Sequence, residues 1–139
     1  MSESRPDPSR ILVVEDEPEL AELLAGFLQR RGFATRIAGD GLTACRLTEE
    51  FRPHLILLDI LMPGIDGWEV CRLIRRVPDR RLANIPIIMV SALNSPEDRS
   101  KGIELGAEDY IPKPYRFSEL VTRIGEVLAQ TRRPAKGSP

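Results

Sequence analysis

The stretch Leu55-Ile56-Leu57-Leu58-Asp59 is followed directly by Ile60-Leu61-Met62-Pro63-Gly64. Its four consecutive aliphatic residues predict a strand that is buried on both faces, as in a parallel sheet. The Pro-Gly pair that follows predicts a loop. We therefore expect Asp59 at the carboxyl end of a buried strand, which is the edge where open α/β sheets bind their ligands.

A second apolar run, residues 11–14, also ends in acids, namely Glu15 and Asp16. If this strand lies beside the one that ends at Asp59, three carboxylates meet at one edge of the sheet. They would repel one another unless a cation lay among them. The pattern therefore predicts a metal site with hard oxygen ligands.

Strand-like and helix-like patterns alternate along the chain. The predicted strands cover residues 11–14, 33–37, 55–59, 87–90 and 110–111, and the predicted helices begin at Pro18, Gly41, Gly67, Pro96 and Ser118. This (βα)5 alternation predicts an α/β fold, a doubly wound parallel five-stranded sheet with helices on both faces. Pro112 cannot donate a ladder hydrogen bond, so the fifth strand should lie at an edge. The flavodoxin-like strand order 2-1-3-4-5 meets this condition and sets strands one and three side by side.

Length and composition limit the function further. The chain has 139 residues and a net charge of −1, so we expect one domain and no general attraction to nucleic acid or to anionic membranes. We expect that domain at residues 10–130, after a flexible segment at 1–9 and before a polar tail or linker stub at 131–139. The two cysteines have no metal-ligand spacing, and no apolar stretch is long enough to span a bilayer, so we expect a cytoplasmic protein.

Five polar positions should converge at the carboxyl edge of this sheet. They are Glu15, Asp16, Asp59, Ser91 and Lys113. A carboxylate beside a divalent metal and an ammonium group is equipped for phosphoryl transfer, because the carboxylate can attack phosphorus while the cations neutralise the phosphoryl oxygens. A serine hydroxyl at the next strand end could donate a hydrogen bond to one of those oxygens.

From residue 10 to residue 130 the chain resembles the receiver domain of two-component response regulators, in the CheY-like superfamily. The resemblance rests on Glu15-Asp16, Asp59 with Met62-Pro63-Gly64, Ser91-Ala92, and Tyr110 with Lys113-Pro114, in this order on a (βα)5 pattern.

The resemblance implies a role for each of these residues. Asp59 would be the phosphoacceptor. Mg²⁺, or Mn²⁺ in its place, would bind to Glu15, Asp16, Asp59 and the backbone carbonyl of Leu61. Ser91 and Lys113 would sense the phosphoryl group, and Tyr110 would be the aromatic switch that rotates inward. The family also holds the bond corresponding to Lys113-Pro114 in the cis form.

As a receiver domain the chain would be a regulatory switch that catalyses only its own phosphorylation and dephosphorylation. The phosphodonor would be a histidine kinase, a phosphotransfer protein or a small phosphorylated molecule. Its phosphorylation would control an output domain or a partner protein. The alternative is a degenerate receiver that works as a constitutive protein-interaction module without phosphorylation.

The resemblance also implies an interaction surface, because receivers attached to winged-helix transcription factors often dimerise through the face that corresponds here to the helix from Pro96, the fifth strand and the last helix. Residues of this chain that resemble that surface are Arg99, Ile103, Asp109, Glu119 and Arg123. A third charge pair is broken, because Val127 stands where Glu108 would need a basic partner. We therefore expect a monomer or a weak phosphorylation-dependent dimer.

Two departures from the family pattern bear on chemistry. Glu15 replaces the commoner Asp, so its carboxylate reaches one methylene further. Leu61 and Leu93 stand two residues after Asp59 and Ser91, and neither side chain can hydrogen-bond an attacking water. We expect slow spontaneous dephosphorylation.

Two other classes of protein fit the sequence poorly. A haloacid-dehalogenase type hydrolase also starts from an Asp at a strand end, but it needs a second acid where this chain has Leu61. A flavodoxin-like redox carrier needs a Ser/Thr/Gly-rich phosphate loop after the first strand, where this chain has Glu15-Asp16-Glu17.

Overall fold

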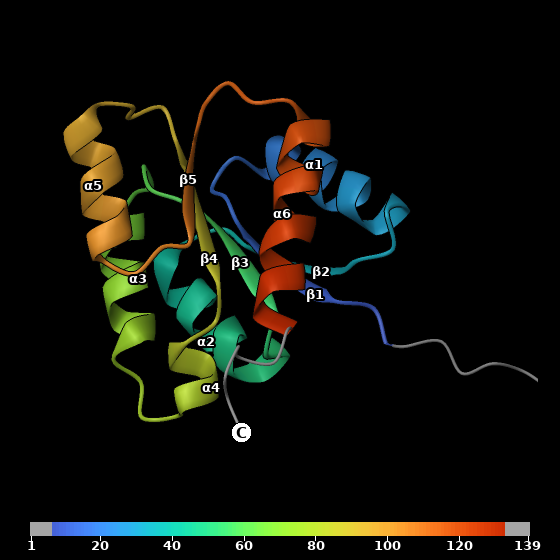
Figure 1. The fold of residues 1–139 in the computed structure, drawn as a ribbon, viewed down its shortest axis with the longest axis horizontal. Helices are drawn as coiled ribbons and strands as arrows, with labels where there is room; N and C mark the ends of the chain where they lie inside the picture. The colour runs from blue at the N-terminus through green and yellow to red at the C-terminus, as the bar shows by residue number, and fades with distance from the viewer. Residues whose placement is uncertain (1–6, 133–139) are drawn as a thin grey trace, which may run out of the picture.

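The computed structural model describes residues 7–132, so the expectations for residues 1–6 and 133–139 lie outside it. Its strands and helices alternate as predicted, except that one additional short helix, α4 (Arg80–Ala83), follows α3 (Gly67–Arg75) (Figure 1). The strands are β1 (Arg10–Val14), β2 (Ala34–Ala38), β3 (Leu55–Asp59), β4 (Ile87–Ser91) and β5 (Asp109–Pro112). The helices are α1 (Pro18–Arg30), α2 (Gly41–Phe51), α3 (Gly67–Arg75), α4 (Arg80–Ala83), α5 (Pro96–Glu104) and α6 (Phe117–Arg132).

The five strands form one parallel sheet in the order β2-β1-β3-β4-β5. This confirms the predicted fold class and strand order, including β5 at an edge. Val14 pairs with Leu58, and Asp59 pairs with Val90. This register brings the carboxyl ends of β1 and β3 together at one edge of the sheet, where the acids of the predicted site follow.

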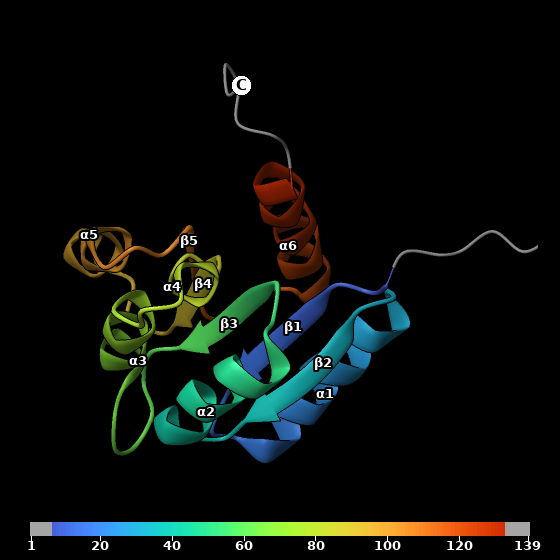
Figure 2. The same ribbon diagram turned by 90° about the horizontal axis from the view of Figure 1, so that it is seen from below.

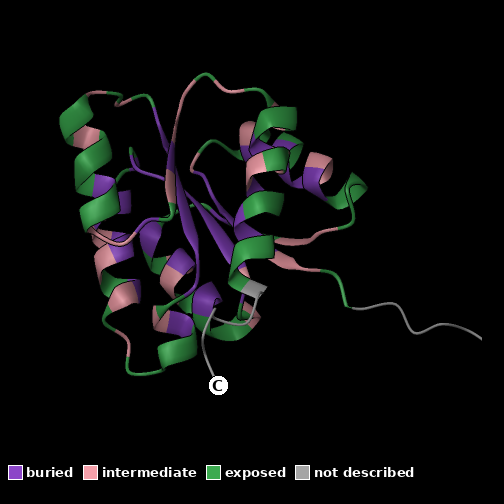
Figure 3. Cartoon of the chain, viewed as in Figure 1, coloured by how far each residue is buried: buried purple, intermediate pink, exposed green. Residues whose placement is uncertain are grey.

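Helices cover both faces of the sheet (Figure 2). A hydrophobic cluster on each face holds them to it. On β3, Leu55 and Leu57 pack with α1 and α6, whereas Ile56 and Leu58 belong to the cluster under α2, α3 and α4. The strand is therefore buried on both faces, as its apolar run predicts, and the purple centre of Figure 3 shows this burial.

Some boundaries differ from the prediction. Helix α4 was not predicted, because four residues carry no apolar period; its start is fixed by Asp79, whose carboxylate accepts a hydrogen bond from the Arg81 amide. Helix α6 continues past Gln130 to Arg132. Within residues 7–132, no helix combines the length and apolarity that crossing a membrane demands.

Candidate functional site

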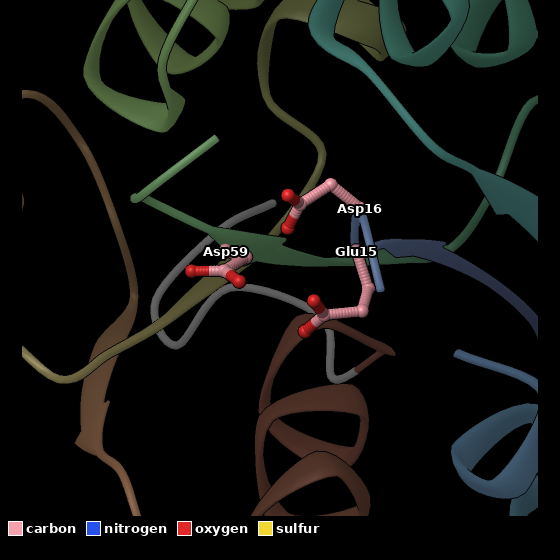
Figure 4. Close-up of side chains that lie close together, drawn as sticks. All are labelled: Glu15, Asp16 and Asp59. Atoms are coloured by element: carbon pink, nitrogen blue, oxygen red, sulfur yellow. The ribbon is translucent and has the colours of Figure 1, made fainter. Parts of the chain in front are cut away.

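Three carboxylates meet where β1 and β3 end (Figure 4). Glu15 and Asp16 follow β1 directly, and the Glu15 amide extends the pairing with β2 by donating to the carbonyl of Ala38 at 3.0 Å. Asp59 is the last residue of β3. Glu15 and Asp59 are buried and Asp16 is half-buried. The three acids therefore converge in the structure, as predicted.

The three acids fit a small hard cation. One carboxylate oxygen from each lies within 4.8 Å of the other two. Two oxygens on opposite sides of one Mg²⁺ lie about 4.2 Å apart, twice the metal–oxygen distance, so a small side-chain adjustment would let all three bind. The donors are all oxygens, which Mg²⁺ prefers. The role of the Leu61 carbonyl stays a prediction.

Lys113 lies against the two buried acids. Its Nζ is 3.0 Å from Asp59 Oδ2 and 3.2 Å from Glu15 Oε1. The backbone fixes this position, because the Lys113 amide donates to the carbonyl of Ser91 at 2.8 Å. The Lys113-Pro114 bond is cis, as expected. The lysine is therefore held over the carboxylates by the end of the neighbouring strand.

Every carboxylate oxygen of Glu15 and Asp59 has a donor. Glu15 Oε2 accepts from the Glu17 amide at 3.1 Å, and Asp59 Oδ1 accepts from the Leu61 amide at 3.1 Å. The other two oxygens face Lys113. These donors orient both carboxylates without a metal, which lowers the cost of arranging the site when a cation binds.

Burial and charge act in opposite directions in this cluster. Loss of solvent raises the pKa of Glu15, and the nearby Asp59 charge raises it further, against the hydrogen bond from Glu17 and the charge of Lys113. Burial on its own would lower the pKa of Lys113, but the hydrogen bond and charge of Asp59, with those of Glu15, raise it overall. Lys113 is therefore held as a cation between the two acids.

Ser91 and Tyr110 lie on the neighbouring strands β4 and β5. Ser91 is fully buried, and its Oγ accepts from the Leu93 amide at 3.1 Å. Tyr110 was expected to rotate inward on phosphorylation, but its ring is already buried, with 4% exposed, and its hydroxyl donates to the Leu93 carbonyl at 2.6 Å. Of the two leucines that follow Asp59 and Ser91 by two residues, Leu61 is exposed and Leu93 is half-buried.

No pattern in the sequence singles out Tyr115 as a residue of the site. Its hydroxyl is buried and has no hydrogen-bond partner among residues 7–132, and burial raises its pKa. The ring lines a mainly apolar hollow of about 400 Å³ together with Lys113, Leu20 and Phe117. A tyrosine at this position is therefore close to the charged cluster without bonding to it.

The predicted interaction face is partly assembled within one chain. Arg123 pairs with Asp109, whereas Arg99 bonds to Asn94 and Ile103 is exposed. Val127 is buried in the core. The partner of Glu108 is Arg75, 3.9 Å away, whose guanidinium also donates to the carbonyls of Ala83, Ile85 and Gly106.

Known proteins with related sequences are regulators. The model of the response regulator receiver domain matches residues 11–125. Over 115 residues, 83% of this chain and 48% of the relative, it is 44% identical to the DNA-binding response regulator MtrA of Mycolicibacterium smegmatis. Over 124 residues, 89% of this chain and 51% of the relative, it is 36% identical to the DNA-binding dual master transcriptional regulator RpaA of Synechocystis sp.. The chain spans about half the length of these relatives.

Solved structures agree. The receiver domain of the Francisella response regulator 1452 aligns with a TM-score of 0.82 at 29% identity, covering 89% of this chain and 99% of that one. The BeF3-activated N-terminal receiver domain of Klebsiella pneumoniae RstA aligns with a TM-score of 0.77 at 31% identity, covering 90% and 100%. The chain belongs to the response regulator receiver domain family.

Proposed function

We propose that this receiver domain is phosphorylated on Asp59, with Mg²⁺ held by Glu15, Asp16, Asp59 and the Leu61 carbonyl. The observation that carries the proposal is the cluster itself: a buried carboxylate bonded to Lys113, with carboxylate oxygens of two further acids within 4.8 Å. Mn²⁺ offers similar coordination and should substitute.

The reaction transfers one phosphoryl group. A carboxylate oxygen of Asp59 attacks phosphorus, the bond from phosphorus to the donor breaks, and the donor leaves with the electron pair. The donor is a phosphohistidine, which leaves as imidazole, or acetyl phosphate, which leaves as acetate. A bound divalent cation supplies positive charge to the phosphoryl oxygens. Lys113 is already in contact with Asp59, and it would engage the new oxygens together with the Ser91 hydroxyl.

The result of phosphorylation would be a changed protein surface rather than a metabolic product. Phosphorylation would bias an existing equilibrium of the face made by α5, β5 and α6, through Ser91 and Tyr110. Within that face, Arg99, Ile103, Asp109, Glu119 and Arg123 would contact a partner or a second copy. Hydrolysis of the acyl phosphate by the domain itself would reset the switch.

The partners follow from this role. A histidine kinase or a phosphotransfer protein would supply the phosphoryl group in the cytoplasm. MtrA and RpaA are DNA-binding regulators, and the residues that match this chain make up about half of each. We therefore propose that this domain controls an attached or separate output module. The domain itself would not contact nucleic acid, and it would dimerise weakly or not at all.

Intact-mass spectrometry after incubation with acetyl phosphate and Mg²⁺ tests the proposal. The parent should gain about 80 Da, the mass of one phosphoryl group, and a chelator or Asp59→Ala should abolish the gain. Asp40→Asn is the matched control, because Asp40 is an exposed carboxylate that caps α2 and asparagine can keep that cap. A folded, Mg²⁺-binding parent without an adduct would instead indicate the degenerate interaction module.

A further inference from the structure

The buried position of Tyr110 links two functional segments. Its hydroxyl donates to the carbonyl of Leu93, and the Leu93 amide donates to Ser91 Oγ. Leu93 lies in the loop between β4 and α5. The tyrosine on β5 therefore tethers the loop that follows Ser91, and the position of its ring affects that loop directly.

Trp68 packs against this tyrosine from α3. The two ring centroids are 6.4 Å apart with an interplanar angle of 28°, a stacked arrangement. Trp68 is itself buried in the same cluster as Tyr110. Such aromatic pairs stabilise an arrangement beyond the area that they bury. Tyr110 moving outward would therefore lose both the stacking contact and the Leu93 hydrogen bond.

Helix α5 closes over the same pair. The Lys101 Nζ lies 4.6 Å from the centroid of the Trp68 ring, a cation–π contact between α5 and α3. The next residue is Gly102, where an added Cβ would lie 2.9 Å from Tyr110 Cδ2 and 3.0 Å from Met89 Sδ. Only a residue without a side chain lets α5 approach the tyrosine ring this closely.

The start of α3 also lies directly against the phosphoacceptor strand. The Gly67 amide donates to the carbonyl of Ile60 at 2.8 Å. A Cβ added at Gly67 would lie 2.5 Å from the carbonyl oxygen of Asp59. Trp68, the next residue, is therefore placed by the backbone that carries Asp59, which connects the acidic site to Tyr110 through packed atoms.

We propose that Trp68 is a positioning residue of the switch, which together with Lys101 holds Tyr110 in its buried position before phosphorylation. The proposal rests on the proposed function of Asp59. As a consequence, the unphosphorylated domain already favours the inward position of the Tyr110 ring. Phosphorylation then needs to shift the population less than it would if the ring started in the outward position.

The environment of Tyr110 can be measured without any phosphoryl group. The chain has two tyrosines and one tryptophan, so Tyr115→Phe leaves Tyr110 as the single site for 3-fluorotyrosine. Fluorine NMR of this metal-free protein should give a signal that is insensitive to exchange of H₂O for D₂O, as expected for a buried ring. Trp68→Leu should raise the ratio of solvent-exposed to buried signal about two- to tenfold, and Trp68→Phe should restore the parent ratio.

Lys101→Gln should raise the same ratio about two- to fivefold, the range for exposed cation–π contacts. Arg80→Gln, an exposed charge on α4, is the matched control and should leave it unchanged. A folded Trp68→Leu protein whose Tyr110 signal stays buried would overturn the proposal. If Trp68→Leu does not fold, Lys101→Gln on the exposed face of α5 tests the proposal instead, and an unchanged Tyr110 signal in that variant would overturn it.

These outcomes are separate from those of the mass measurement. If no phosphoryl adduct forms, the proposed function is wrong. The fluorine signal would still measure whether Trp68 keeps the Tyr110 ring buried. If Asp59 is phosphorylated but the fluorine signal of Tyr110 does not change in Trp68→Leu, the proposed function stands and the positioning role of Trp68 is wrong.

Discussion

Lys113 is ion-paired with Asp59, Nζ to Oδ2, at 3.0 Å, and the same nitrogen contacts Glu15 at 3.2 Å. The two acidic side chains are each 4% exposed, against 23% for the lysine. Within residues 7–132 no other ion pair reaches these two carboxylates. One cation therefore compensates two buried negative charges in this structure.

Replacing this lysine should destabilise the metal-free protein more than the metal-bound one. Lys113→Met leaves Asp59 and Glu15 without their shared donor, so the free energy of unfolding should fall by about 1–3 kcal/mol. Saturating Mg²⁺ should recover part of the loss, because it neutralises the same carboxylates. Urea unfolding with and without Mg²⁺ measures both quantities. Arg80→Met is the surface control, and an equal loss with and without the metal would contradict the explanation.

Glu15 should make the stability of the metal-free protein fall as the pH rises. Burial and the Asp59 charge raise its pKa above the ordinary value of 4.5, so the folded state binds the proton more tightly than the unfolded state does. The corresponding stability is fully present below pH 4.5 and is lost as the pH rises through the folded pKa. The pKa of Lys113 is also raised, so its contribution is lost only in strongly alkaline solution.

Comparison of Glu15→Gln with the parent isolates this effect. From about pH 4 to pH 8, the parent should lose stability relative to the variant, as followed by urea unfolding at each pH. The variant should also bind Mg²⁺ more weakly, since an amide replaces a carboxylate ligand. Parallel stability curves would show that Glu15 ionises in the folded protein as it does in water.

The sequence predicts the sheet and the acidic cluster because both depend on patterns within a few residues. An apolar run such as residues 55–59 is recognisable by itself, and parallel α/β packing then places the strand ends together. Asp59, Glu15 and Lys113 converge for this reason. The helix at Arg80–Ala83 was missed because its start depends on the Asp79 cap and not on an apolar period.

Contacts made by single side chains across the fold could not be predicted in this way. Trp68 and Lys101 come from different helices, and their approach depends on how α5 packs over Gly102. Arg75 donates to the carbonyls of Ala83, Ile85 and Gly106. Backbone carbonyls carry no sequence signal, because every residue has one. The buried state of Tyr110 follows from the same tertiary packing.

Leu61 and Leu93 should keep the phosphoryl group on Asp59 for long periods. Neither leucine can hydrogen-bond or activate water, whereas polar side chains two residues after Asp59 and Ser91 could do so. The double variant Leu61→Asn, Leu93→Glu should therefore shorten the lifetime of the acyl phosphate by about tenfold or more. Decay of the phosphorylated species after removal of acetyl phosphate, followed by intact mass, measures it. A Leu61→Met, Leu93→Met control keeps both sites apolar, and a double variant as long-lived as the parent would refute the explanation.

The Tyr110 hydroxyl should stabilise the fold, whereas the Tyr115 hydroxyl should not. The Tyr110 hydroxyl donates to the Leu93 carbonyl, so Tyr110→Phe should lower the free energy of unfolding by about 1 kcal/mol. The Tyr115 hydroxyl is buried without a partner among the described residues, so Tyr115→Phe removes an unsatisfied polar group and keeps the ring. That change should leave the free energy of unfolding equal or raise it by about 1 kcal/mol.

Urea unfolding of both variants at neutral pH measures the two effects, and each variant serves as the control for the other. A loss of stability in Tyr115→Phe as large as in Tyr110→Phe would mean that the Tyr115 hydroxyl forms a hydrogen bond in solution.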